Sequence, residues 1–295
     1  MIDLSKQKFC VWGFKNPPYD TFRHIHEAFY RALKFLGKNV SWLDARDDIS
    51  GIDFSNTFFI TQNNAVMREV GSIPLREDCF YAVHNNIQGG RERFERLDVL
   101  PYGVRLAGIP EFDPNGLSVN IPWATDLLPH EIEANKPSTV FQSRSKVVNY
   151  VGSVWSVNRK EIDAFANACF DNGINFSQVQ GGVSIEDNVR LIRESYMAPA
   201  IVGSGHPVGY LPCRIFKNIS YGQFGVTNSS YVNDLFEGRL VYNSDTYGLF
   251  FDARERLAKT PLSELHSLMD YVAKNHTYLN RIDTLIHGAR MILER

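Results

Sequence analysis

The sequence has no long hydrophobic run. None of its apolar stretches approaches the roughly 18 residues that a membrane-spanning helix needs. The first residues, MIDLSKQKFCVWGF, are too short and too polar for a secretory signal peptide. We therefore expect no membrane span and a cytoplasmic location.

Cysteine pairs and an excess of charge of one sign are also absent. The four cysteines, Cys10, Cys79, Cys169 and Cys213, lie far apart and form no CxxC pair, which predicts reduced thiols. With 31 lysines and arginines against 33 aspartates and glutamates, the formal net charge is −2. This balance removes the electrostatic argument for a protein that binds nucleic acid.

The glycine motif of dinucleotide-binding proteins is missing as well. No GxGxxG follows the first expected strand, where VWGFKNPP has one glycine and two prolines. A dinucleotide-dependent oxidoreductase is therefore the weakest hypothesis. What the sequence does contain is apolar material for sizeable cores, because 44% of its 295 residues are hydrophobic and 13% are aromatic. That length suggests one large domain or two of ordinary size.

The first half alternates strand and helix patterns. KFCVWGF (8–14) and VSWLDA (40–45) predict strands, and apolar residues at helical spacing between them predict a helix that Gly37 ends. Further strands are expected at 57–62 (TFFITQ), 79–85 (CFYAVHN) and, more weakly because of Pro101, 97–105 (LDVLPYGVR).

The second half repeats the alternation. VVNYVGS (147–153) predicts a strand, and an apolar stripe from Ile162 to Phe170 predicts the helix after it. Ser184 with Asp187 resembles a capping box that starts a helix over 185–196, and Thr260-Pro261 is expected to start a later one. Further strands are expected at 174–179, 199–203, 224–228 and 239–242.

These halves predict an α/β fold of two Rossmann-like βαβ domains that face each other across a cleft. The expected parts are an N-terminal domain at 1–120, a connection at 121–146, a C-terminal domain at 147–272, and a closing helix at 273–295 that can pack back on the first domain. In open parallel sheets, ligands bind beyond the carboxyl ends of the strands, so the cleft is the expected site.

Two stretches of the second half carry candidate binding residues. Gly152 and Ser153 lie where a strand turns into a helix, so that they and Arg159 can receive an anionic group. The alternative, which the Gly-Ser turn taken alone favours, is a tight turn without a ligand. Arg214 begins a helix after a loop that contains His206. The helix macrodipole disfavours a cation there, so Arg214 needs either an anionic ligand or a nearby carboxylate, and both alternatives stay open.

The stretch from VSIEDNVRLIRESYMAPAIVGSG through PCRIFKNISYGQFGVTNS resembles the nucleotide-sugar-binding half of GT-B glycosyltransferases, most of all the exostosin-like and CgeB-like groups. In those groups a serine at a strand end, a variable loop, an Arg-led helix and a Gly-led turn with its strand follow in this order. Here they correspond to Ser204, 205–213, Arg214 and Gly222 to Thr227. The segments IPWATDLLP and NHTYLNRIDTLI are similar to the interdomain segment and closing helix of the same fold. The first half matches only in architecture.

The resemblance implies a hexosyl- or pentosyltransferase that moves a sugar from a nucleotide-diphosphate donor, of the UDP or GDP type, to a hydroxyl of a glycan or glycoconjugate. The diphosphate would lie near Gly152, Ser153 and Arg214, and the base and ribose near 180–188 and the helix after Arg214. The residues expected around the donor are Gly152, Ser153, Arg159, Gly182, Ser204, His206, Tyr210, Arg214 and Lys217. No cofactor is expected. The Asp-x-Asp motif of metal-dependent GT-A enzymes is absent, since LDARDD (43–48) has the carboxylates without the spacing.

One departure from the family pattern bears on the mechanism. Many retaining GT-B enzymes carry two glutamates eight positions apart, which would fall at Gly209 and Lys217, and neither residue is acidic. This favours an inverting displacement, in which a base from the first domain takes the proton of the acceptor hydroxyl. His84 is the main candidate because it follows a strand and titrates in a suitable range. The other candidates are Asp20, Asp44 and Asp47.

Three alternatives remain open. His24 and His26, spaced two apart on a helix, point to different faces and are expected to be structural or to face solvent rather than to bind a metal. The same fold would also suit a nucleotide-sugar epimerase or hydrolase, which would act on the donor without an acceptor. A non-catalytic glycan- or protein-binding relative is compatible with the missing glutamate pair.

Overall fold

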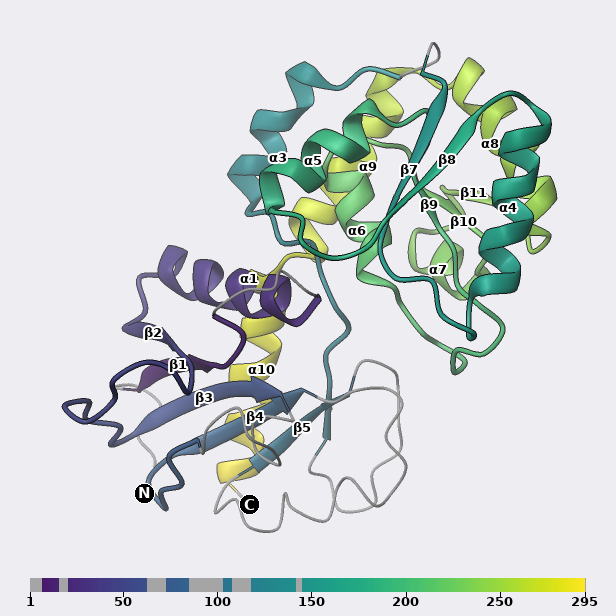
Figure 1. Ribbon diagram of the computed structural model, residues 1–295. Coiled ribbons are helices and arrows are strands. Elements are labelled where there is room, and N and C mark those ends of the chain that lie inside the picture. Colours follow the sequence, from purple (N-terminus) through teal and green to yellow (C-terminus); the bar gives the residue numbers. More distant parts are fainter. Residues whose placement is uncertain are drawn as a thin grey trace. The chain divides into compact units, whose positions relative to one another are not determined.

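The computed structural model describes residues 7–15, 21–62, 73–84, 103–107, 118–141 and 145–294, and it forms two compact units (Figure 1). Unit 1 comprises Met1–Pro122 and Tyr278–Arg295, and unit 2 comprises Trp123–Thr277. The chain therefore passes from one unit to the other twice, and its last helix belongs to the unit in which the chain began.

Unit 1 is built on a six-stranded sheet in the order β2-β1-β3-β4-β5-β6. The strands are β1 (Lys8–Trp12), β2 (Val40–Leu43), β3 (Thr57–Gln62), β4 (Phe80–His84), β5 (Gly103–Ala107) and β6 (Ser118–Asn120). Every neighbouring pair is parallel. The strands expected from the first four apolar runs are confirmed, whereas the run at 97–105 lies only in part within the described residues, as the start of β5.

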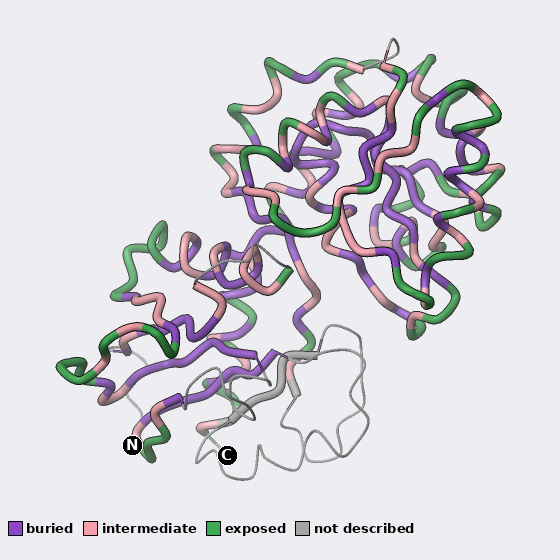
Figure 2. Tube along the Cα trace, viewed as in Figure 1, coloured by how far each residue is buried: buried purple, intermediate pink, exposed green. Residues whose placement is uncertain are grey.

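The apolar character of the central strands follows from their burial on both faces. Every residue of β3 and β4 is buried, and Figure 2 shows both strands in the colour of buried residues. A parallel sheet covered on both sides needs continuous apolar runs rather than an alternating pattern. Thr57, Thr61, Gln62 and His84 are buried polar residues of these two strands, and Gln62 and His84 are each the last residue of their strand.

Two helices of unit 1 pack against each other although the sequence separates them widely. Helix α1 (Thr21–Phe35) buries an apolar stripe, and Gly37, at φ +67°, ends it as expected. The rings of Phe29 on α1 and Tyr278 on α10 (Tyr278–Leu293) are 4.6 Å apart. Gly288 lets α10 approach β6, since a Cβ there would lie 2.7 Å from a methyl group of Val119.

Unit 2 holds two smaller parallel sheets. Strands β7 (Val147–Val151) and β8 (Asn175–Val179) form one, and β9 (Pro199–Ala200), β10 (Val226–Thr227) and β11 (Val241–Tyr242) form the other, in the order β11-β10-β9. The helical segments are α3 (Pro129–Asn135), the short 3₁₀ helix η3 (Lys136–Ser138), α4 (Arg159–Asp171), α5 (Ile185–Glu194), α6 (Cys213–Ser220), α7 (Ser230–Leu235), α8 (Thr246–Lys259) and α9 (Leu262–Asn275).

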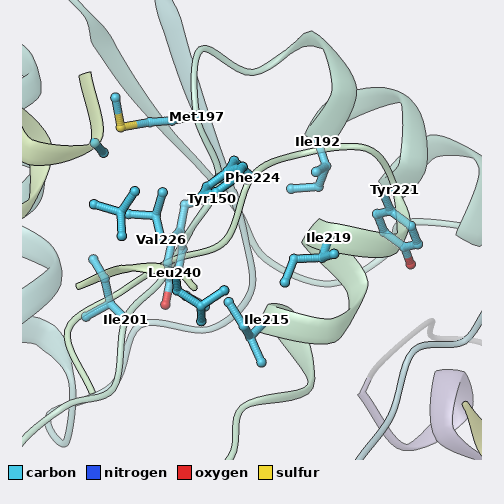
Figure 3. Close-up of a cluster of buried hydrophobic side chains, with 14 of the residues drawn as sticks. Tyr150, Ile192, Met197, Ile201, Ile215, Ile219, Tyr221, Phe224, Val226 and Leu240 are labelled. Carbon is cyan, nitrogen blue, oxygen red and sulfur yellow. The ribbon is translucent and has the colours of Figure 1, made fainter. Parts of the chain in front are cut away.

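The core of unit 2 surrounds α6. Figure 3 shows Ile215 and Ile219 of this helix among the buried side chains that include Ile192 and Phe224. Strands β9, β10 and β11 have two residues each, and polar side chains add hydrogen bonds to the few that pair their backbones. Asn228 clamps the end of β9 because its amide accepts from the Val202 N–H at 2.7 Å and donates to the Val202 carbonyl at 2.8 Å.

The expected helix starts are confirmed in one case and wrong in the other. The Ser184 hydroxyl accepts from the amide of Asp187 at 3.1 Å and caps α5. Thr260 does not cap α9; its hydroxyl donates back to the Arg256 carbonyl of α8 at 2.9 Å, and Pro261 stands one position before the first helical residue. The proline cannot extend α8, so Thr260 closes one helix instead of opening the next.

The α/β class with parallel sheets is confirmed in both units. Among the described residues, no helix combines the length and the apolar character that crossing a membrane requires.

Candidate functional site

Arg214 lies at the carboxyl end of β7 in unit 2, where the sequence predicts an anion site. Its Nε donates to the carbonyl of Val151 at 3.1 Å and its Nη1 donates to the Tyr150 hydroxyl at 2.7 Å. The guanidinium carbon also lies 4.1 Å from the centre of the Tyr150 ring. Stacking and two hydrogen bonds therefore fix the orientation of the guanidinium group.

The carboxylate alternative for Arg214 is wrong. Both of its hydrogen-bond acceptors are uncharged, and no carboxylate among the described residues pairs with it. The positive charge is thus held near the first turn of α6, and no residue in the described ranges neutralises it. Because the helix dipole also disfavours a cation there, this position favours an anion that contacts both the guanidinium group and the helix end.

Gly152 leaves room for that guanidinium group. The residue has φ +148°, and a Cβ on it would lie 1.9 Å from Nη2 of Arg214. Its amide donates to the Val179 carbonyl at 2.9 Å, which joins the ends of β7 and β8. Glycine is needed at this position both for its backbone angle and because the Arg214 side chain fills the space.

Two loops beside this point are locked together through glycines. A Cβ on Gly203 would lie 1.9 Å from the Val157 carbonyl oxygen, and the amide of Gly205 donates to that oxygen at 3.2 Å. The buried side chain of Asn158 accepts from the Trp155 amide at 2.8 Å and donates to the Ser153 carbonyl at 3.3 Å. The loop after β7 and the loop after β9 therefore form one fixed backbone surface.

His206 and Tyr210 lie on the second of these loops. Their rings stack with centroids 4.3 Å apart and an interplanar angle of 6°. Burial lowers the pKa of His206, and the positive charge of Arg214 acts in the same direction. Burial also raises the pKa of Tyr210 to about 12. Both side chains are therefore neutral at pH 7, so Arg214 supplies the positive charge of this group.

Ser204 is already engaged within the protein. Its amide donates to Oε1 of Glu161 at 3.1 Å. Burial opposes the charge of Glu161, but its hydrogen bonds with Ser204 prevail and lower its pKa. Glu161 lies in the first turn of α4, so this contact ties the loop after β9 to that helix.

The remaining expected donor residues lie in different settings. Lys217 forms an ion pair with Asp126 at 2.8 Å, and the Tyr221 hydroxyl donates to the same carboxylate at 2.6 Å. Arg159 is exposed at the start of α4, and Ser153 is half-buried beside Gly152. Gly182, at φ +68°, is exposed in the turn after β8, with open space where a Cβ would stand.

The candidate base His84 is fully buried in unit 1. Its Nε2 lies 2.7 Å from Nε2 of His26, and the Phe22 ring stacks on it with centroids 5.9 Å apart. Burial lowers the pKa of His84 well below its ordinary value, and burial also lowers the pKa of His26 to about 4. Both rings are therefore neutral at pH 7. Of the two roles expected from the sequence for His26, structural or facing solvent, the structural one is confirmed.

The aspartate candidates have local roles. Asp44 accepts from the Arg46 amide at 3.0 Å, and Asp47 accepts from the Asp44 amide at 2.8 Å. Asp47 also pairs with Lys15 at 2.7 Å; burial opposes its charge, yet these hydrogen bonds lower its pKa. Both carboxylates thus stabilise the turn after β2. Asp20 lies outside the described residues.

Sequence reasoning identified Gly152 but missed Tyr150, Asn158 and Glu161, which hold Arg214 and its loops. Tyr150 lies on β7, and Gly152 stands two positions later, directly after the last residue of that strand. An aromatic residue followed two positions later by a glycine offers a ring for stacking and room for a planar cation beside it. This spacing could have indicated a binding place for an arginine side chain. Asn158 and Glu161 gave no comparable signal. No three His, Cys, Asp or Glu side chains in the described part of the chain gather as a metal site would require.

Comparison with solved structures supports the fold. The chain is similar to α,α-trehalose 6-phosphate synthase from Burkholderia multivorans, with 11% identity and a TM-score of 0.50 over 92% of this chain and 82% of that one. An α,α-trehalose-phosphate synthase (UDP-forming) from Burkholderia vietnamiensis has 11% identity and a TM-score of 0.47 over 92% and 79%. No family model matches the sequence, and the comparison with curated proteins gives no match.

At 11% identity the first likeness shows a shared fold, which is that of the GT-B glycosyltransferases. The closer resemblance to the exostosin-like and CgeB-like groups remains a prediction.

Proposed function

We propose that the protein is a glycosyltransferase that moves a sugar from a nucleotide-diphosphate donor to a hydroxyl group of a glycan or glycoconjugate. Unit 2 binds the donor, and its diphosphate contacts Arg214 beside Gly152. The observation that carries this proposal is the guanidinium group of Arg214, which Tyr150 and Val151 fix at the carboxyl end of β7 and which pairs with no carboxylate of the part of the chain that the structure describes. The shared GT-B fold makes a nucleotide sugar the ligand that best suits such an anion site.

The chemistry of transfer gives Arg214 its role. When the bond between sugar and phosphate breaks, negative charge develops on the departing nucleoside diphosphate, and a fixed cation stabilises it. The guanidinium group needs little reorganisation, because its orientation is already set by stacking and two hydrogen bonds. The first turn of α6 adds N–H groups that favour the same charge. We therefore propose leaving-group stabilisation that uses no metal ion.

An inverting displacement fits the two positions where retaining relatives carry glutamates. Position 209 is a glycine, and position 217 is a lysine whose charge is paired with Asp126. Inversion then requires a base for the acceptor hydroxyl, and His84 is the proposed one. It is neutral and can accept a proton, but it is fully buried and the Phe22 ring stacks on it, so the acceptor can reach it only after side chains that cover it move.

Isothermal titration of the full chain with UDP, GDP and other nucleoside diphosphates tests the donor site. We expect one of them to bind, and Arg214→Ala to weaken that binding while the thermal unfolding midpoint stays near that of wild type. If none of the nucleoside diphosphates binds, the proposal is wrong. A screen of nucleotide sugars with a hydrolysis readout then identifies the sugar, and rapid isomerisation of the free donor would indicate an epimerase instead.

A further inference from the structure

Three buried polar side chains, those of Gln62, His84 and His26, lie at or beside one edge of the sheet in unit 1. Gln62 is the last residue of β3 and His84 the last of β4, and the two are partners in the strand register. Partnered residues on parallel strands project from the same face, so Gln62 lies on the face where His84 meets His26 of α1. All three side chains are fully buried.

This edge is where the strand order makes a ligand site favourable. In the order β2-β1-β3-β4-β5-β6, β2 lies on one side of β1, and β3 to β6 follow one another on the other side. The strand order therefore reverses between β1 and β3. Ligands of open parallel sheets bind beyond the carboxyl ends of the strands at such a point. After β1, Gly13 and Phe14 have φ of 95° and 56°. A left-handed phenylalanine is uncommon and marks a strained turn of the kind found at functional sites.

The two histidines present a fixed set of donors and acceptors. The Gly13 carbonyl can only accept, so Nδ1 of His26, at 2.8 Å from it, carries a hydrogen. A neutral His26 then has a lone pair on Nε2, and Nε2–H of His84 donates to it across 2.7 Å. The lone pair of His84 is therefore on its Nδ1. Neither ring adds a charge.

Gln62 is the unexplained member of the group. Among the described residues, neither its amide nitrogen nor its amide oxygen has a hydrogen-bond partner, although both atoms are buried. A buried amide without partners is unfavourable for the folded state and calls for an explanation. By contrast, Gln223 in unit 2 is equally buried, and its amide nitrogen donates to the Ile192 and Ser195 carbonyls at 3.0 and 2.8 Å.

Gln62 and the two histidines carry no charge, which bears on the kind of ligand they can bind. His26 and His84 are neutral, and Lys15 after β1 is paired with Asp47 after β2. A primary amide presents one donor group and one acceptor group, which matches a hydroxyl in both of its roles. Arg23 of α1 also lies at this edge, where its Nη1 donates to the Lys15 carbonyl and its guanidinium carbon lies 5.4 Å from the centre of the Trp42 ring.

We propose that Gln62 contacts the acceptor through hydrogen bonds, and that the acceptor presents an uncharged polyhydroxyl group, such as an unphosphorylated sugar ring, to this edge of unit 1. The proposal deepens the glycosyltransferase assignment and rests on it for the word acceptor. It divides the substrate chemistry between the units: the anionic group binds at Arg214, and the neutral hydroxyl groups bind at Gln62.

The test compares Gln62→Met with the matched control Gln223→Met in the full chain. Methionine keeps the length of the side chain and removes the amide. We expect Gln62→Met to raise the thermal unfolding midpoint, since it removes polar atoms without partners, and Gln223→Met to lower it. Ligand-observed NMR with methyl glycosides of glucose, galactose and mannose, and with glucose 6-phosphate, then measures binding. We expect a neutral glycoside to bind wild type at least about tenfold more tightly than Gln62→Met.

The possible failures can be told apart. If Gln62→Met binds the glycosides as wild type does, or lowers the unfolding midpoint as Gln223→Met does, the role of Gln62 is wrong. Preference of wild type for glucose 6-phosphate over every neutral glycoside would overturn the uncharged character of the site. Nucleotide titration of wild type and of Gln62→Met is the independent readout. If wild type binds no nucleoside diphosphate, the donor site is wrong, and the glycoside result stands by itself.

Discussion

The guanidinium group of Arg214 occupies the space that a side chain at position 152 would need, with Nη2 1.9 Å from the position of a Cβ on Gly152. The two residues are 62 positions apart in the sequence. Each therefore limits what the other can be.

Gly152→Ala is expected to remove Arg214 from its place on Tyr150. It also strains the backbone at φ +148°, but the atom its Cβ meets is the end of a flexible side chain rather than backbone, so the rest of the fold can stay in place. Nucleotide affinity should fall at least about tenfold, as a charged hydrogen bond is worth about 1.5–3 kcal/mol. Gly203→Ala is the contrast, since its Cβ would meet the backbone of Val157 at 1.9 Å. Thermal unfolding should show a much larger loss for Gly203→Ala, and equal losses would contradict this reading.

Tyr150→Phe separates the hydrogen bond to Arg214 from the stacking. It removes the hydroxyl that accepts from Nη1 and keeps the ring under the guanidinium group. We expect a loss of about 1 kcal/mol in nucleotide binding, roughly fivefold, against about 2 kcal/mol for Arg214→Ala. Calorimetric titration of the two single variants and the double variant checks this, since a double variant no weaker than Arg214→Ala shows that Tyr150 acts through Arg214.

Lys217→Met should destabilise the protein strongly. The pair of Lys217 and Asp126 is nearly enclosed, with side-chain exposures of 12% and 3%, so removing the cation leaves a carboxylate buried without its charge partner. Breaking such a pair costs about 3–5 kcal/mol.

Lys259→Met is the matched control, because its pair with Glu255 is about 70% exposed on both sides and is worth about 0.5 kcal/mol or less. Urea unfolding measures both variants. Adding Asp126→Asn to Lys217→Met should recover part of the loss, and similar losses in the two lysine variants would show that the buried pair is unimportant.

The buried histidines of unit 1 predict acid sensitivity. Burial lowers the pKa of His26 from 6.5 to about 4. Between pH 6.5 and pH 4, His26 is therefore protonated in the unfolded chain and neutral in the folded chain. Stability is therefore present above pH 6.5 and falls as the pH drops toward 4, by about 3 kcal/mol for this group. His84 acts in the same direction. Urea unfolding between pH 7 and pH 4 should show a flatter profile for His26→Phe than for wild type.

The strands and helices could largely be predicted because burial leaves a periodic record in the sequence. The run TFFITQ holds three consecutive apolar residues, Phe58 to Ile60, because β3 is covered on both faces, and the stripe of α1 repeats at helical spacing because one side of it meets the core. Where a local pattern had two uses, prediction failed. Thr260-Pro261 suits a helix start, but the hydroxyl bonds backward to Arg256.

The candidate site could be predicted only in part, because its contacts join residues that are distant in sequence. Arg214 and Gly152 were each identifiable as an oddly placed arginine and a turn glycine, whereas their contact was not. The register that places Gln62 next to His84 depends on the pairing of β3 with β4. Whether the Gln62 amide has a hydrogen-bond partner among the described residues depends on all the elements packed around it. A single sequence carries no signal for either.

The double passage of the chain between its units has a consequence for biosynthesis. Unit 2 is one uninterrupted segment, Trp123–Thr277, and all of it is synthesised, and emerges from the ribosome, ahead of α10. The sheet of unit 1, although translated first, must wait for that helix and its contacts with Phe29 and Val119. Because domains tend to fold as units during translation, the second unit to be made is the first that can finish folding, and a chain truncated before Tyr278 would leave the earlier unit incomplete.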